Sequence, residues 1–126
     1  DLAVRARLAG WRTVYVPEAV VYHKLSATGG GAYASYRVAR NRVWMLARCW
    51  PGALLRRHAW AIARAQATCA LDALRHWRGA AARATLRGLV VGWLTWPRWV
   101  AARQRILRRR RVVDAALAVW LAPPGA

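Results

Sequence analysis

The sequence predicts an α/β fold for residues 1–50, with a helix, two short strands and a loop, followed by a mostly α-helical extension over residues 51–126. Three observations predict this division. A short helical segment ends at a glycine, two β-branched runs flank a proline, and the rest of the chain is rich in alanine, leucine and arginine at helical spacing. We therefore expect two parts, with the strands confined to the first.

The first fifty residues justify the α/β prediction element by element. Residues 2–9 are expected to form a helix, because Asp1 suits an N-cap and Gly10 suits the positive φ that often ends a helix. Polar and apolar residues alternate over 12–16, as in a half-buried strand, and the apolar run 19–22 predicts a second strand after a proline turn.

Helices are expected over most of the remaining chain. The glycine-rich segment 26–35 predicts a loop or a flexible entry to the next helix, which should run over about 34–47 and end at Pro51. A long helix is expected over about 53–77. Further expected features are a resumed helix between Gly79 and Gly88, a break or helix start at Pro97, a basic stretch over 103–111, an apolar helix over 112–121 and a tail over 122–126.

The charge balance favours anionic partners. Among 126 residues there are 22 basic and 4 acidic side chains, a net charge of +18. Nucleic acid, phospholipid surfaces and phosphate-bearing ligands all suit such a chain. Lys24 and Asn41 are the only lysine and asparagine. This skew indicates compositional drift toward arginine, which explains the choice of arginine over lysine but not the scarcity of acidic residues.

Cysteine usage and hydropathy exclude some classes. Cys49 and Cys69 lack the spacing of metal ligands, which predicts reduced thiols in a cytosol-facing chain. The apolar segment 89–96 is far shorter than the roughly 20 residues that a membrane-spanning helix needs. We therefore expect no transmembrane segment.

Two blocks of sequence carry a resemblance to a known family. Asp1-Leu-x-x-Arg5 continues to Gly10-Trp11 and then to Val-Pro-Glu-Ala-Val-Val-Tyr-His23, and an Arg-Asn pair follows at Arg40-Asn41. This order resembles the last section of a family 2 glycosyltransferase catalytic domain, of the rhamnosyltransferase-like kind. The resemblance implies a GT-A fold and inverting transfer of a sugar from a nucleotide-diphosphate donor to a lipid-linked or cell-envelope polysaccharide acceptor.

The resemblance also implies roles for particular residues. It places the catalytic base and an Asp-x-Asp motif before Asp1, so that this chain would be a fragment, catalytically silent alone. His23 would be a ligand of Mg²⁺ or Mn²⁺, since neutral imidazole can bind such a metal. Arg37 and Arg40 share a helical face at i, i+3 and, with Asn41, could hold donor phosphates. Ser26 and Thr28 could line a phosphate-facing loop. The alternative for this loop is a flexible linker. The alternative for Arg37 and Arg40 is that both are solvated side chains.

The basic helices predict a peripheral membrane contact. Arg57, Arg64 and Arg75 fall within about 20° of one another on a continuous helical wheel, with Trp60 and Trp77 on the flanks. Tryptophan with arginine suits the headgroup region of an anionic membrane, which places the protein in the cytoplasm on the inner face of the cell membrane. Tryptophans buried in a helical core are the alternative. An Arg-rich nucleic-acid-binding or membrane-binding module remains the competing function, although no nucleic-acid-binding signature is present, and we expect no nucleic-acid partner.

Overall fold

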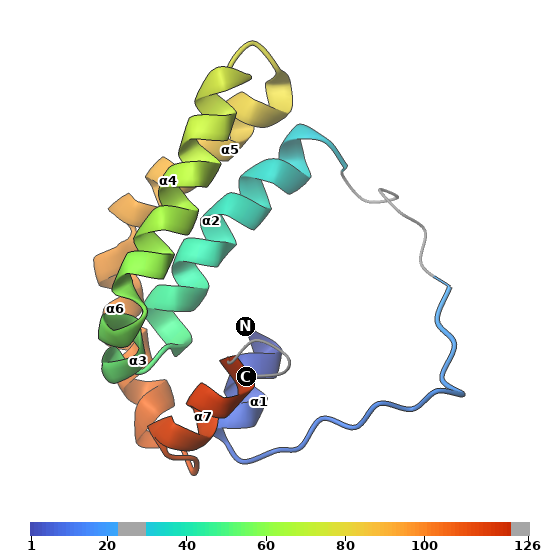
Figure 1. The fold of residues 1–126 in the computed structure, drawn as a ribbon, viewed down its shortest axis with the longest axis vertical. Coiled ribbons are helices and arrows are strands. Elements are labelled where there is room, and N and C mark those ends of the chain that lie inside the picture. The colour runs from blue at the N-terminus through green and yellow to red at the C-terminus, as the bar shows by residue number, and fades with distance from the viewer. Residues whose placement is uncertain (23–29, 122–126) are drawn as a thin grey trace.

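The computed structural model describes residues 1–22 and 30–121, which form seven helices (Figure 1). The longest helices are α2, α4 and α5, and α6 follows α5. The shorter helices α1, α3 and α7 lie near one end of α2. The helices are α1 (Leu2–Leu8), α2 (Ala32–Cys49), α3 (Gly52–Arg57), α4 (Ala59–Arg75), α5 (Ala80–Leu94), α6 (Trp96–Arg108) and α7 (Asp114–Leu121).

The closest packing joins α2 to α5. Two glycines one turn apart, Gly88 and Gly92, are buried on the face of α5 that meets α2. A Cβ atom added at Gly88 would lie 2.5 Å from the backbone oxygen of Tyr36, and one added at Gly92 would lie 2.9 Å from Cβ of Val43. These distances are shorter than van der Waals contact, so the two helices approach this closely only because both positions lack a side chain.

Two small apolar clusters stabilise the arrangement. One joins Ala39 and Val43 of α2 to Leu89 of α5, with Cys69 and Ala70 of α4 packed against it. The second joins the short helices to α6. Its buried members are Leu8, Leu54 and Leu117, and the partly buried residues around them are Val4, Trp50, Ile106, Leu107 and Val112.

Most of the predicted helices are confirmed, with changes at their ends; the helix predicted between Gly79 and Gly88 continues to Leu94 as α5. Gly10 ends α1 at a φ of 87°, as expected from its sequence position. The helix expected over 34–47 begins earlier and extends to Cys49, because Trp50 is extended ahead of Pro51. The prediction of one helix over 53–77 is wrong, since the helix is interrupted at His58, where α3 ends and α4 begins. Arg57 therefore does not share a continuous wheel with the arginines of α4.

The two predicted strands are wrong. Residues 11–22 contain one turn and no other regular secondary structure, and no β-strand forms among the residues that the structure describes. A strand needs a neighbour to pair with its backbone groups, and this segment runs away from the helices (Figure 1). Its apolar side chains are solvated, with Tyr15 86% and Val21 84% exposed. The predicted α/β fold, and with it the GT-A arrangement expected for residues 1–50, is replaced by an all-helical one.

The division into residues 1–50 and 51–126 stays a prediction. In the structure α2, from the first part, packs along α5 and α6, from the second. Each of the two apolar clusters thus contains residues from both parts.

Substituting Gly88→Ala is expected to destabilise the protein by about 1–3 kcal/mol, because the new methyl group meets a backbone oxygen that cannot rotate away. Urea unfolding followed by circular dichroism measures the effect. Gly52→Ala is the matched control: its methyl group would meet only the flexible end of Arg56 at 3.7 Å, so stability should be unchanged or slightly raised. Equal stabilities of the two variants would contradict the close contact.

Candidate anion-binding site

One face of α2 forms the wall of a surface pocket with a volume of about 630 Å³. Its lining includes four arginines and one carboxylate, so the pocket is strongly positive. The residues come from α2, from α6 and from the start of the chain, and they are Asp1, Arg37, Val38, Arg40, Asn41, Arg42, Trp44, Met45, Arg48 and Trp99.

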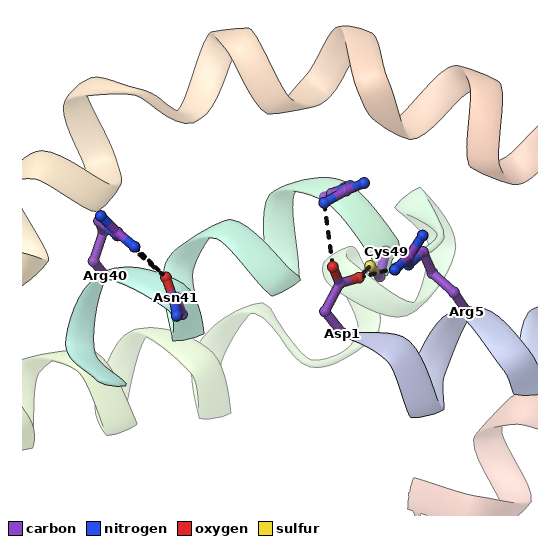
Figure 2. Close-up of polar contacts among 6 residues, drawn as sticks. Asp1, Arg5, Arg40, Asn41 and Cys49 are labelled. Carbon is purple, nitrogen blue, oxygen red and sulfur yellow. Dashed lines mark hydrogen bonds and ion pairs between the residues drawn. The ribbon is translucent and has the colours of Figure 1, made fainter. Parts of the chain in front are cut away.

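Arg40 is held in place by its neighbours on α2. Its Nε and Nη2 atoms both donate to Oδ1 of Asn41, at 3.1 and 2.9 Å (Figure 2). Its guanidinium lies 3.9 Å from the ring centroid of Trp44 and 5.2 Å from that of Tyr36. An arginine fixed by a hydrogen-bonded fork and an aromatic ring loses little side-chain entropy when an anion binds. Arg40 is therefore a pre-oriented cation at the pocket wall.

The aromatic part of the pocket is fixed from α5 and α6. Nε1 of Trp44 donates to Oγ1 of Thr95 at 2.7 Å, and that hydroxyl donates to the backbone oxygen of Val91. The rings of Trp44 and Trp99 lie 4.8 Å apart at an interplanar angle of 42°. Because the residue that ends α5 holds an indole of α2, the packing of these helices sets the shape of the pocket.

The carboxylate of Asp1 joins α1 to the end of α2. It accepts from Nε of Arg5 at 3.0 Å, from Nη1 of Arg48 at 3.2 Å and from Sγ of Cys49 at 2.9 Å (Figure 2). The residue occupies the predicted N-cap position, but its side chain makes no capping bond to α1. Its contacts instead bring together segments 47 positions apart in sequence.

Two buried donors beside the pocket lack a partner among the residues that the structure describes. They are Nε of Arg48 and Nε1 of Trp99. Both groups can only donate hydrogen bonds, and an unpaired buried donor carries a cost of about 1–3 kcal/mol. An oxygen atom of a ligand in the pocket could accept a hydrogen bond from these donors and remove that energetic cost.

The thiol of Cys49 is buried under this cluster. Burial raises the pKa of the Cys49 thiol above its ordinary value of 9.0, and the positive charge of Arg48 offsets part of that rise. The thiol is thus protonated near neutral pH and donates to Asp1. Because the pKa is higher in the folded state, this group supports stability below about pH 9 and loses that contribution as the pH rises further.

The residues predicted from sequence divide into two sets. Arg37, Arg40 and Asn41 lie together in the pocket, as their helical spacing indicates. His23, Ser26 and Thr28 lie outside the described residues, so their roles stay predictions. Within the described ranges no group of three His, Cys, Asp or Glu side chains comes close enough to hold a metal ion.

Sequence reasoning missed several residues of the pocket, among them Trp44, Arg48 and Trp99. Trp44 and Arg48 continue the stripe of Arg37, Arg40 and Asn41 at spacings of three or four. Trp44 lies within the helix predicted over 34–47, and Arg48 lies one residue beyond it. Trp99 enters from α6, and no local pattern places it there.

Comparison with family models, with curated protein sequences and with solved structures gives no match for this chain. Evidence for function therefore comes from the residues of the pocket and from the resemblance in the sequence.

The two thiols are expected to react at very different rates. Cys49 is fully buried and Cys69 is half-buried, so at pH 8 a thiol-specific disulfide reagent should modify Cys69 readily and Cys49 only after unfolding. Peptide mapping of the modified protein identifies the site. Equal labelling of both thiols in the folded protein would contradict the burial of Cys49 under Asp1.

Proposed function

We propose that this pocket binds the phosphates of a nucleotide-diphospho-sugar. The chain is then part of a glycosyltransferase that moves the sugar to a lipid-linked or cell-envelope polysaccharide acceptor. One observation carries the proposal. The two blocks that resemble family 2 glycosyltransferases, around Asp1 and around Arg40-Asn41, are distant in sequence and line the same pocket.

The chemistry of the wall supports a diphosphate ligand. A guanidinium fork can donate two hydrogen bonds to phosphate oxygens at once. Arg40 already uses Nε and Nη2 on Asn41, which leaves its remaining N–H groups for a ligand. Arg37, exposed one turn earlier, adds a second cation beside it. The indoles of Trp44 and Trp99 offer an aromatic surface near these cations, which suits the base of a nucleotide.

Other parts of the reaction rest on the resemblance. It assigns the base that deprotonates the acceptor hydroxyl to a position before Asp1, and metal binding to His23. Mg²⁺ or Mn²⁺, when bound, neutralises charge on the departing diphosphate. The residues of the pocket hold the diphosphate on the protein and compensate its charge.

The competing function is a basic module for nucleic acid. A duplex backbone is read by arginines on a protruding face, and such binding needs no concave site. The arginines of the pocket instead converge on a hollow beside aromatic rings. This geometry favours a small anionic ligand.

Replacing Arg40→Ala is expected to weaken binding of a nucleoside diphosphate by about tenfold or more, since a hydrogen bond to a charged group contributes about 1.5–3 kcal/mol. Titration with uridine, guanosine and thymidine diphosphates, followed by tryptophan fluorescence, measures it. Arg12→Ala is the control: it removes the same charge from the exposed segment 11–22 and should leave the affinity unchanged.

Two results would contradict the assignment. Equal affinities of the Arg40→Ala and Arg12→Ala variants would show that the pocket is not the binding site. Displacement of the nucleotide by a random DNA duplex at lower concentration than by inorganic pyrophosphate would favour the nucleic-acid function.

The metal prediction has its own test. Adding Mn²⁺ should tighten binding of the nucleoside diphosphate to the unmodified chain, and His23→Ala should reduce that gain while leaving metal-free binding unchanged. An identical Mn²⁺ titration in both proteins would remove His23 from the metal site.

A further inference from the structure

The solvent face of α4 carries an apolar stripe. Trp60 is 80% exposed, Leu71 53% and Leu74 54%. At 100° per residue these three side chains fall within about 60° of one another, with only alanine between them on that face. The opposite face packs toward α5 and buries Ala73 and Gln66. The stripe is therefore a continuous surface along a helix of 17 residues.

Two arginines accompany the stripe. Arg64 and Arg75 are exposed and lie within about 60° of Trp60 on the same wheel. Asp72, the acidic residue of α4, is 3.5 Å from the ring of His76 at the C-terminal end of the helix. An apolar centre with cations beside it is the arrangement of helices that lie in the headgroup region of a bilayer.

The positive charge of the protein indicates which partner binds this face of α4. The chain carries a net charge of +18, so a second copy would be repelled and an anionic partner attracted. A nucleic-acid backbone would satisfy the arginines but would leave Leu71 and Leu74 in water. An anionic lipid surface matches both parts of the face.

We propose that the solvent face of α4 docks on an anionic lipid bilayer. Trp60, Leu71 and Leu74 enter the boundary between headgroups and acyl chains, and Arg64 and Arg75 lie at the lipid phosphates. The contact lies on the surface: no helix in the described ranges has the length and apolarity needed to cross a membrane. This surface is separate from the pocket on α2, so the proposal does not depend on the glycosyltransferase function.

Co-sedimentation of the full chain with vesicles tests it. Vesicles of phosphatidylglycerol and phosphatidylcholine should bind the protein, vesicles of phosphatidylcholine alone should bind it weakly, and binding should fall as salt is raised. The double variant Leu71→Ser/Leu74→Ser should lose about tenfold or more in affinity for the anionic vesicles, since two apolar side chains no longer leave water. Both positions are exposed, so circular dichroism should show an unchanged fold.

Matched control variants distinguish binding through the α4 face from binding through the total charge or tryptophan content of the protein. Trp60→Ala should weaken binding, whereas Trp11→Ala, at a tryptophan 71% exposed on the extended segment, should not. Arg64→Glu/Arg75→Glu should weaken it more than Arg12→Glu/Arg98→Glu, which changes the net charge equally at exposed positions elsewhere.

Three results would overturn the proposal. Wild-type binding by the Leu71→Ser/Leu74→Ser variant would show that α4 is not the contact. Tighter binding to a random duplex than to anionic vesicles at matched salt would assign the basic surface to nucleic acid. A dimer in sedimentation equilibrium that the same leucine variant dissociates would assign the face to a second copy of the chain.

Discussion

The close approach of α2 and α5 determines most other features of the molecule. At Gly88 the backbone of α5 lies against the backbone of α2, near Tyr36 and Arg40, with no side chain between them. Dispersion contacts between backbones accumulate only at such short range. The glycines also carry a cost, because each loses more conformational freedom on folding than alanine would. The gain from close packing has to exceed that cost for the pair of helices to form.

This contact also determines where the functional groups lie. A Cβ atom at Gly88 would be 3.2 Å from the backbone nitrogen of Arg40, so α5 fixes the backbone at the position that carries the pocket's pre-oriented cation. Thr95, at the end of α5, then holds Trp44. Packing of α2 on α5 thus sets the geometry of the neighbouring, positively charged face of α2. The small residues Cys69 and Ala70 pack α4 against the cluster between α2 and α5, and the apolar stripe of α4 stays exposed.

The helices were predictable because their signals are local. Gly10 with a positive φ, Pro97 in the first turn of α6 and the alanine-rich runs each act within a few residues. Three of the residues that line the pocket were predictable for the same reason, since Arg37, Arg40 and Asn41 share a face by helical spacing alone. The glycine spacing at Gly88 and Gly92 was also visible in the sequence, but only the structure shows which helix it meets.

The wrong predictions concern interactions between distant parts of the chain, which a local sequence pattern does not predict. Alternation over residues 12–16 and β-branched residues over 19–22 indicate a local preference for extended backbone, but the structure forms no strand over these residues. A strand also requires a pairing partner, and the helical neighbours of this segment offer none. Likewise no local pattern predicted the interruption at His58 or the position of Trp99 in the pocket.

Nuclear Overhauser contacts between α2 and α5 provide a direct test of this packing. Close contact at the glycines predicts cross-peaks between the Hα protons of Gly92 and the methyl groups of Val43, and between the Hα protons of Gly88 and the methyl group of Ala39. Each pair spans the contact and needs no substitution that could disturb it. Absence of both cross-peaks in spectra where these resonances are assigned and sharp would show that the helices do not meet at the glycines. The described position of the pocket would then also be wrong.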